Sequence, residues 1–289
     1  EIDARLRAAH RGQVQFLYLA PERLLTERLR GQLPALDVRL LAIDEAHCIS
    51  QWGHEFRPAY RQIEAFRGLL PASVPVMALT ASATPLVRQD IEQQLALRTP
   101  ARFVQTVARP NLRYAVLYDG DRMAALRRVL GKVPGSALVY VRARRAAEEL
   151  AQELRRAGVP AAAYHAGLAP ELRERTQAAW LAGATRVVVA TTAFGMGIDK
   201  PDVRAVVHWQ LPPGPESYYQ EAGRAGRDGE VAYAVLLYDE GAAATHQRQL
   251  EERYPDWPTL ERCYAVLCQR TGTTDRCCDP AARLPLSLS

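Results

Sequence analysis

The sequence lacks any segment of the form Gly-x-x-x-x-Gly-Lys-Ser/Thr, the loop in which backbone amides and a lysine bind the phosphates of a nucleotide. Lysine itself is scarce. Only Lys132 and Lys200 occur, and Lys132 fits a loop that leads into a strand. This way of holding phosphates is therefore excluded for the 289 residues of the sequence.

Apolar runs of about 20 residues, the length that crosses a bilayer, are absent too, and no secretory signal precedes the first apolar segment. We therefore expect a cytoplasmic protein with no membrane partner. In that compartment the five cysteines are not expected to form disulfides. The formal net charge of +5 favours a polyanionic partner, although a solvated arginine-rich surface explains it equally well.

The chain does contain apolar strand-like runs that alternate with helical stretches, which is the pattern of a mainly parallel sheet covered on both faces. The predicted fold class is α/β, and the length allows two domains. Strands are expected at 15–19, 39–43, 74–79, 137–141, 161–164, 187–190, 205–209 and 232–237, and helices at 22–30, 58–67, 85–95 and 144–157. In the last helix, Ala147, Leu150, Ala151 and Leu154 recur at helical spacing and are assigned to packing.

Two adjacent carboxylates, Asp44 and Glu45, follow the apolar run Leu40–Ile43. Ligands of open α/β sheets bind at the carboxyl ends of strands. In a phosphate site the first acid can hold the shell of a Mg²⁺ ion while the second orients and deprotonates the attacking water. The alternative is the acidic N-terminus of a helix, where both residue types are favoured.

The longer segments around these acids resemble one family. Residues 44–58, Asp-Glu-Ala-His-Cys-Ile-Ser-Gln-Trp-Gly-His-Glu-Phe-Arg-Pro, resemble the Walker B motif and the aromatic-rich loop of RecQ DNA helicases, which belong to superfamily 2. The resemblance continues in family order through residues 78–85, 163–168, 190–201 and 216–229. It covers the chain from about Phe16 to about Gly229.

The resemblance implies two RecA-like parallel-sheet domains and a shorter C-terminal segment. We expect residues 1–108 to be the C-terminal part of the first domain and residues 109–250 to be the second domain. Residues 251–289 are expected to begin a zinc-binding or helical region. The family's phosphate loop would lie upstream, so the chain is expected to be a fragment that is inactive without it.

By resemblance, the parent protein is an ATP-dependent helicase that moves 3′ to 5′ on single-stranded DNA and unwinds duplexes. ATP and Mg²⁺ are the expected ligands, single-stranded and forked DNA are the expected partners, and a monomer is the expected state. Two alternatives stay open. One is an RNA helicase of the DEAH group, against which residues 48–58 argue, and the other is a nonenzymatic nucleic-acid-binding module.

The spacing of Gln220, Arg224 and Arg227 places all three on one face if they share a helix. Two guanidiniums on such a face can reach a γ-phosphate and stabilise the charge that develops during transfer. A surface turn rich in glycine and arginine is the alternative. The resemblance makes Arg227 the arginine finger, Arg224 its companion and Asp199 an acid near the nucleotide.

The segment after the acids carries Trp52, His54, Phe56 and Arg57 close together, an unsuitable composition for a core strand. Bases stack on such side chains without sequence preference, each for about 1–3 kcal/mol. By resemblance this loop, with His47 beside it, senses single-stranded DNA and signals to the ATP site. The alternative is that Trp52 or Phe56 pins the loop to the core, and we assign that partly structural role to Phe56.

Two threonines, Thr191 and Thr192, follow a predicted strand, and Gly195 and Gly197 come soon after them. Hydroxyls and close backbone amides in such a place can hold nucleic-acid phosphates, with a flexible loop as the alternative. His165 ends another strand on the same edge. We expect it to contact the DNA backbone, and the competing interpretation is a structural histidine.

Four cysteines cluster near the C-terminus: Cys263, Cys268, Cys277 and Cys278. RecQ proteins carry a four-cysteine zinc module at this place. Adjacent cysteines such as the last two rarely serve one tetrahedral ion, because their side chains diverge. Zinc binding and free thiols both stay open, and we favour free thiols.

Overall fold

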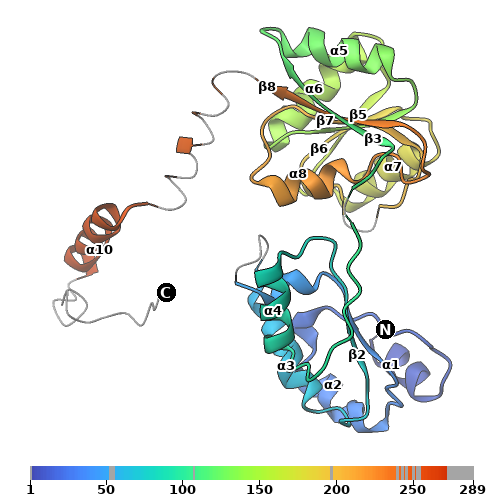
Figure 1. Ribbon diagram of the computed structural model, residues 1–289, viewed down its shortest axis with the longest axis vertical. Helices are drawn as coiled ribbons and strands as arrows, with labels where there is room; N and C mark the ends of the chain where they lie inside the picture. The colour runs from blue at the N-terminus through green and yellow to red at the C-terminus, as the bar shows by residue number, and fades with distance from the viewer. Residues whose placement is uncertain are drawn as a thin grey trace. The chain divides into compact units, whose positions relative to one another are not determined.

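The computed structural model describes residues 2–51, 56–106, 108–195, 198–238 and 255–271, and the single positions 241, 244, 247, 248 and 251. The chain divides into two compact units. Residues 1–110 and 214–223 form the first, and residues 111–213 and 224–289 form the second. In Figure 1 the residues before 110 are coloured from blue to green. The segment 214–223, expected in the second domain from the sequence, thus groups with the first unit.

The first unit contains a two-stranded parallel sheet in which β1 (Leu41–Ile43) pairs with β2 (Val76–Ala78). Its helices are α1 (Ile2–His10), α2 (Glu27–Gln32), α3 (Gln62–Arg67), α4 (Pro85–Gln94) and α8 (Pro215–Ala222), and its 3₁₀ turns are η1 (Pro21–Arg23), η2 (Leu33–Ala35), η3 (Ala46–Ile49) and η4 (Pro58–Arg61). Apolar side chains from most of these elements form one buried core that includes Leu6, Leu29, Ile43, Phe66 and Ile91.

Two predictions for this unit were wrong. Residues 15–19 form no strand, and Phe16 and Tyr18 are exposed. The sheet order here is β1–β2, so this segment has no described neighbour with which to pair its backbone. The helix predicted at 22–30 is interrupted, because Thr26 adopts an extended conformation and α2 begins only at Glu27. The strands predicted at 39–43 and 74–79 are confirmed with shorter bounds.

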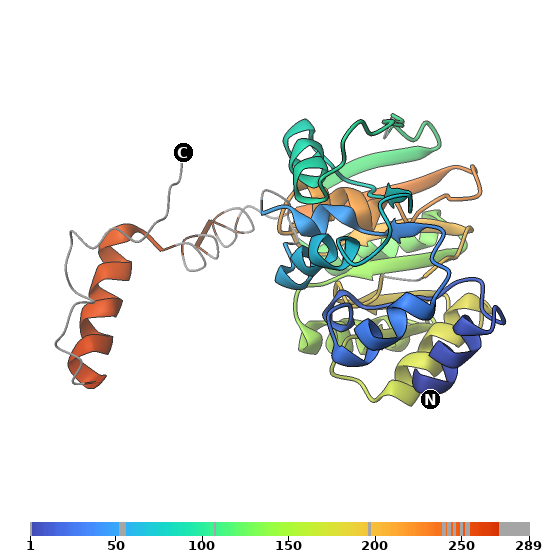
Figure 2. The ribbon, with the colours of Figure 1, turned by 90° about the horizontal axis from the view of Figure 1, so that it is seen from below.

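The second unit is built on six parallel strands in the order β3-β8-β7-β4-β6-β5. They are β3 (Leu112–Tyr118), β4 (Ser136–Tyr140), β5 (Ala161–Tyr164), β6 (Val187–Ala190), β7 (Val203–His208) and β8 (Ala232–Tyr238). Figure 2 shows the green to orange strands from a second side. The five strands predicted in this part are confirmed, and β3 was missed.

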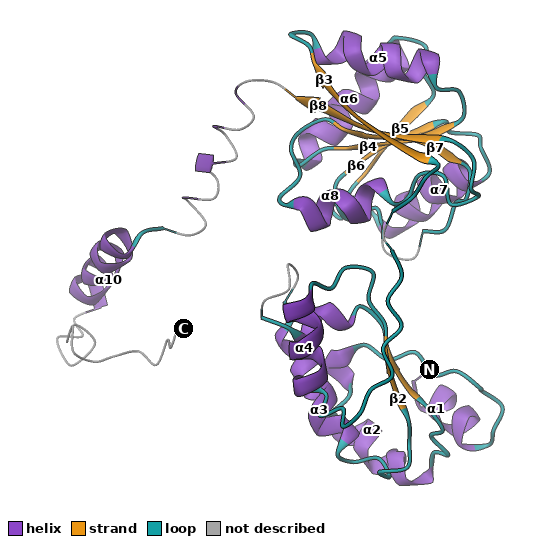
Figure 3. Ribbon diagram, in the orientation of Figure 1, coloured by secondary structure: helices purple, strands orange, loops and turns teal. Residues whose placement is uncertain are grey.

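Helices cover both faces of this sheet. α5 (Arg122–Lys132) and α6 (Arg144–Arg156) lie on one face, and α7 (Pro170–Leu181) lies on the other (Figure 3). The inner strands β4 and β6 are buried at every residue and therefore read as continuous apolar runs, such as Val187–Ala190. A longer helix, α10 (Trp257–Thr271), follows β8 in the chain.

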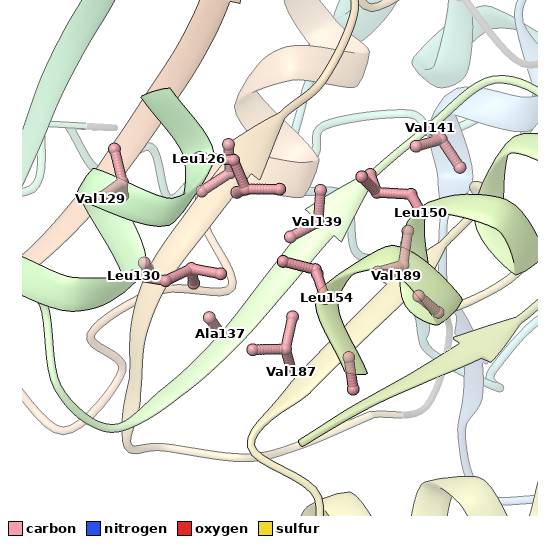
Figure 4. Close-up of a cluster of buried hydrophobic side chains, with 14 of the residues drawn as sticks. Leu126, Val129, Leu130, Ala137, Val139, Val141, Leu150, Leu154, Val187 and Val189 are labelled. Atoms are coloured by element: carbon pink, nitrogen blue, oxygen red, sulfur yellow. The ribbon is translucent and has the colours of Figure 1, made fainter. Parts of the chain in front are cut away.

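The core between the sheet and its α5–α6 face contains leucines from the two helices and valines from the strands. Leu126 and Leu130 of α5 and Leu154 of α6 point toward Val139 and Val187 in Figure 4. The predicted packing stripe of α6 is confirmed, since Ala147, Leu150, Ala151 and Leu154 are all buried. This core fixes the strand ends from which the loops of the site begin.

Candidate functional site

The two adjacent carboxylates lie directly after β1, at the carboxyl edge of the first sheet. Glu45 has a φ of 50°, a left-handed conformation that costs a residue with a side chain roughly 1–3 kcal/mol. The turn is held because Glu45 N–H donates to Asp44 Oδ1 at 2.9 Å and Ala46 N–H donates to Leu79 O at 2.9 Å. The backbone therefore fixes both acids relative to the end of β2.

A buried histidine connects Glu45 to the segment after β2. His47 Nδ1 lies 3.3 Å from Glu45 Oε2 and 3.0 Å from Thr80 Oγ1. The imidazole is fully buried, whereas the Glu45 side chain is 45% exposed, so the histidine side of these contacts is shielded from water. Farther along the same segment, Gln220 Nε2 donates to Ser82 Oγ at 3.2 Å. The acid pair, His47, Gln220 and the hydroxyls after β2 thus belong to one polar network in the first unit.

The aromatic segment is described only at its ends, and Trp52 and His54 lie outside the described residues. Phe56 is half-buried, and the guanidinium carbon of Arg61 lies 5.1 Å from its ring centre. Arg57 is exposed, and its backbone N–H donates to Cys48 O at 2.9 Å. This bond joins the two ends of the segment close to the carboxylates.

Tyr60, in η4, connects the end of this segment to the acid pair. Its hydroxyl donates to Asp44 O at 3.4 Å, and its backbone N–H donates to Arg57 O at 2.9 Å. Burial raises the pKa of the Tyr60 phenol, so the hydroxyl keeps its proton and remains a donor at neutral pH.

The prediction that Gln220, Arg224 and Arg227 share one helix was wrong. α8 ends at Ala222, so only Gln220 is helical, and both arginines lie in the turns that follow. Gly226 has a φ of 61°, a left-handed conformation that an α-helix cannot include. Asn111 Nδ2 holds this turn by donating to Gly226 O at 2.7 Å.

In the second unit, the two arginines contact the loop that follows β6. Arg227 Nη1 donates to Asp199 Oδ1 at 2.9 Å and to Ile198 O at 3.3 Å. Arg224 Nη1 donates to Gly195 O at 2.6 Å. The structure therefore brings the predicted Asp199 and Arg227 together as an ion pair.

Three further predicted residues lie at the carboxyl edge of this sheet. Thr191 and Thr192 follow β6, and Thr191 N–H donates to Tyr164 O at 3.2 Å at the end of β5. His165 comes next after β5 and is buried, with Nε2 3.0 Å from Glu148 Oε1. The neighbouring strand ends place Thr191 beside His165, while Thr192 is exposed.

The donor atoms suit different metals to different degrees. Carboxylate oxygens such as those of Asp44 and Glu45 are hard ligands of the kind that Mg²⁺ prefers. Among the described residues there is no group of three or more histidine, cysteine, aspartate or glutamate side chains that could hold a metal ion. Cys263 is an exposed free thiol, whereas the Cys268 side chain, Cys277 and Cys278 lie outside the described part, so zinc binding stays a prediction.

Sequence reasoning missed several residues of these networks. Thr80 and Ser82 were noted only as part of a resembling segment, and nothing in the sequence indicated the contact of Tyr60 with Asp44. Thr80 and Ser82 come directly after the strand predicted at 74–79, and this position could have identified them as site residues. None of the helices in the described part of the chain combines the length and apolar character that crossing a membrane requires.

Two family models match the chain: "DEAD/DEAH box helicase" over residues 1–91 and "Helicase conserved C-terminal domain" over residues 121–229. Among curated proteins, ATP-dependent DNA helicase RecQ of Pasteurella multocida is 45% identical over 248 residues, which cover 86% of this chain and 39% of that protein. The RecQ helicase of Bacillus subtilis is 43% identical over 239 residues, covering 82% of this chain and 40% of that protein. The chain spans about two fifths of the length of these relatives.

Solved structures show the same architecture. Saccharomyces cerevisiae Dbp5 bound to RNA and ADP BeF3 matches with a TM-score of 0.60 at 20% identity, over 79% of this chain and 61% of that one. A DEAD box protein from Methanococcus jannaschii matches with a TM-score of 0.50 at 23% identity, over 81% and 62% of the two chains. At such identities the likeness concerns the fold alone, and it confirms the predicted pair of RecA-like parallel-sheet domains.

Proposed function

Because the chain belongs to the RecQ family of superfamily 2 helicases, we propose that it is part of an ATP-dependent DNA helicase that couples ATP hydrolysis to movement on single-stranded DNA. The observation that carries the proposal is the acid pair after β1, where His47 joins Glu45 to the segment after β2. Two fixed carboxylates at a strand end form an arrangement suited to phosphoryl transfer to water.

Each side chain has a distinct chemical task in this proposal. Asp44 would hold a Mg²⁺ ion, which supplies neutralisation of phosphate charge when bound. Glu45 orients the attacking water and accepts its proton. Arg227, held by Asp199, donates hydrogen bonds to the γ-phosphate as negative charge develops there. Gln220 completes the nucleotide-binding set. Arg224, which the sequence also predicts for that set, contacts Gly195 O in the loop after β6.

DNA contacts are proposed for the loops at the carboxyl edge of each sheet. Thr191 and Thr192 offer hydroxyls, and His165 lies beside them, a placement that favours contacts with the phosphate backbone. The aromatic segment that contains Trp52 would stack on bases. The proposed partners are single-stranded and forked DNA, and the proposed direction of movement is 3′ to 5′. The proposal also includes a monomeric state and a cytoplasmic location.

The proposal is tested by ATP hydrolysis in the full-length protein that contains this chain together with a phosphate-binding loop. Glu45→Gln and Arg227→Ala should each lower DNA-stimulated turnover by about 10³-fold or more while much of the ATP binding remains. The controls are Glu153→Gln, an exposed glutamate of α6, and Arg128→Ala, an exposed arginine of α5, which should leave turnover unchanged. Parental turnover in either site variant would refute the assigned role.

The 289 residues alone have no Gly-Lys-Ser/Thr loop, so we propose that they hydrolyse ATP negligibly. Robust DNA-stimulated hydrolysis by this chain, purified free of contaminating ATPases, would contradict that proposal. In the full-length protein, Trp52→Ala should reduce DNA-stimulated hydrolysis more than it weakens DNA binding. Equal stimulation in Trp52→Ala and parent would remove the coupling role of the aromatic segment.

A further inference from the structure

The guanidinium of Arg224 is packed against the backbone of Gly195. Nη1 donates to Gly195 O at 2.6 Å, and a Cβ added to Gly195 would lie 2.9 Å from the guanidinium carbon. Gly195 does not have a left-handed φ, so the absence of a side chain is required here for space and not for backbone conformation. The guanidinium of Arg224 therefore occupies the space that a side chain at position 195 would fill.

The residue before Gly195 is anchored from the sheet. Phe194 is fully buried, its ring centre is 4.5 Å from that of Tyr164 and 5.4 Å from that of Trp180, and its carbonyl accepts from Tyr140 Oη at 2.9 Å. The backbone at 194 is therefore held by buried contacts, directly before the carbonyl of Gly195 that Arg224 binds.

The other end of the same loop is held by the second arginine. Arg227 donates to Ile198 O and Asp199 Oδ1. It follows Arg224 in the same turn, three positions later in the sequence. Both guanidiniums therefore contact residues between β6 and β7, Arg224 at Gly195 and Arg227 at Ile198 and Asp199, but in different ways. Arg227 is paired with an exposed carboxylate, whereas Arg224 Nε is buried and has no hydrogen-bond partner among the described residues.

We propose that Arg224 is a positioning residue for the loop after β6 and not a phosphate ligand. Its contact with Gly195 fixes the backbone that follows Thr191 and Thr192. Because Arg224 and Arg227 lie in the same turn, residues 223–228, this contact couples DNA binding at those threonines to the placement of Arg227. This inference rests on the proposed function, because it assumes that the loop binds single-stranded DNA and that Arg227 acts on ATP.

The inference separates two affinities in the full-length protein. If Arg224 positions the loop, Arg224→Ala should weaken binding of a labelled single-stranded oligonucleotide by about 3- to 30-fold, the usual range for coupling between contacting groups. Binding of a nonhydrolysable ATP analogue should change by less than about twofold, since no phosphate contact is lost. Fluorescence anisotropy at one fixed salt concentration measures the first affinity, because DNA binding depends steeply on salt.

The matching change on the other side of the contact is Gly195→Ala, which displaces the guanidinium without removing any charge. It should reproduce the loss of DNA affinity, and the double variant Gly195→Ala/Arg224→Ala should be no weaker than the weaker single variant. Arg128→Ala removes one positive charge far from the loop in sequence and controls for net charge. Arg224→Lys keeps the charge but not the planar fork, and it should resemble Arg224→Ala.

The outcomes distinguish a failure of the proposed function from a failure of the positioning role alone. A parent protein that binds no single-stranded DNA would overturn the proposed function and this inference with it. If the parent binds DNA but Arg224→Ala weakens only the ATP analogue, or if the losses in the double variant multiply, the positioning role is refuted while the proposed function stands. Thermal midpoints of the variants are measured alongside. If Arg224→Ala fails to fold, Arg224→Lys decides the question by the same two affinities.

Discussion

The hydroxyl of Tyr140 offers the sharpest test of how the loop after β6 is held. It donates to Phe194 O at 2.9 Å, and the two residues are 4% and 0% exposed. Tyr140→Phe deletes this oxygen and leaves the ring, which stacks on His208 at a centroid distance of 5.8 Å. The substitution therefore removes the hydrogen bond to a carbonyl that water cannot reach.

The expected cost follows from the burial of that carbonyl. Leaving a buried acceptor without its donor costs about 1–3 kcal/mol, whereas an exposed hydrogen bond is replaced by water almost without loss. The apolar contacts of the ring are retained, so no cavity larger than the hydroxyl is added. For a chain of this size, each kcal/mol lowers the melting temperature by about 2–4 °C, which gives an expected decrease of about 2–12 °C.

Urea denaturation of the 289-residue chain, followed by tryptophan fluorescence, measures this loss, since Trp180 lies against Phe194 in the same unit. The matched control is Tyr118→Phe, which removes a hydroxyl from a side chain that is 75% exposed in β3. The control should change the free energy of unfolding by less than about 0.5 kcal/mol. If Tyr140→Phe behaves like this control, the hydrogen bond does not hold the loop and the reasoning is refuted.

Three other changes test the core, the electrostatics and the metal prediction. Leu154→Ala, in the fully buried stripe of α6, should lower the free energy of unfolding by about 3–5 kcal/mol in the same urea assay, and a loss below that of Tyr140→Phe would contradict the packing assignment. Hydrogen bonding from Arg204 lowers the pKa of Asp228. The stabilisation that this pair gives the fold is therefore present above the ordinary aspartate pKa and is lost as pH falls through the lowered value. Asp228→Asn should reduce the melting temperature at neutral pH, and the difference from the parent should vanish in acid. If the thiols are free, the purified chain should contain clearly less than one zinc per molecule and chelation should leave its melting temperature unchanged, whereas stoichiometric zinc that is lost in Cys263→Ser would contradict the preference for free thiols.

The second sheet was largely predictable, because parallel strands buried on both faces leave a strong apolar signal. β5 and β6 were predicted with the bounds that the structure shows, and the α6 stripe was predicted residue by residue. The first unit was less so. Residues 15–19 have strand-like composition, but a strand exists only when a neighbour supplies its hydrogen bonds, and composition does not report the neighbour.

The acid pair and Asp199 could be located from the sequence because each follows an apolar run whose end marks a sheet edge. The arginines show the limit of such reasoning. A spacing of four and three residues satisfies a helix, yet Gly226 takes a left-handed φ and Asn111, more than a hundred positions earlier in the chain, binds its carbonyl. The turn is therefore stabilised by a distant residue, and local periodicity has no access to that contact.

The contacts that hold the loop after β6 were hidden for a more general reason. Tyr140, Arg224 and Arg227 all donate to backbone carbonyls, and every residue carries a carbonyl, so residue type at positions 194 and 198 does not identify the acceptor. Gly195 is the exception, because a guanidinium seated on the backbone requires that the side chain be missing. In this loop, therefore, the residue type at position 195 indicates the contact with Arg224. A glycine whose φ is ordinary is the feature to search for when positioning arginines are sought in other loops of this kind.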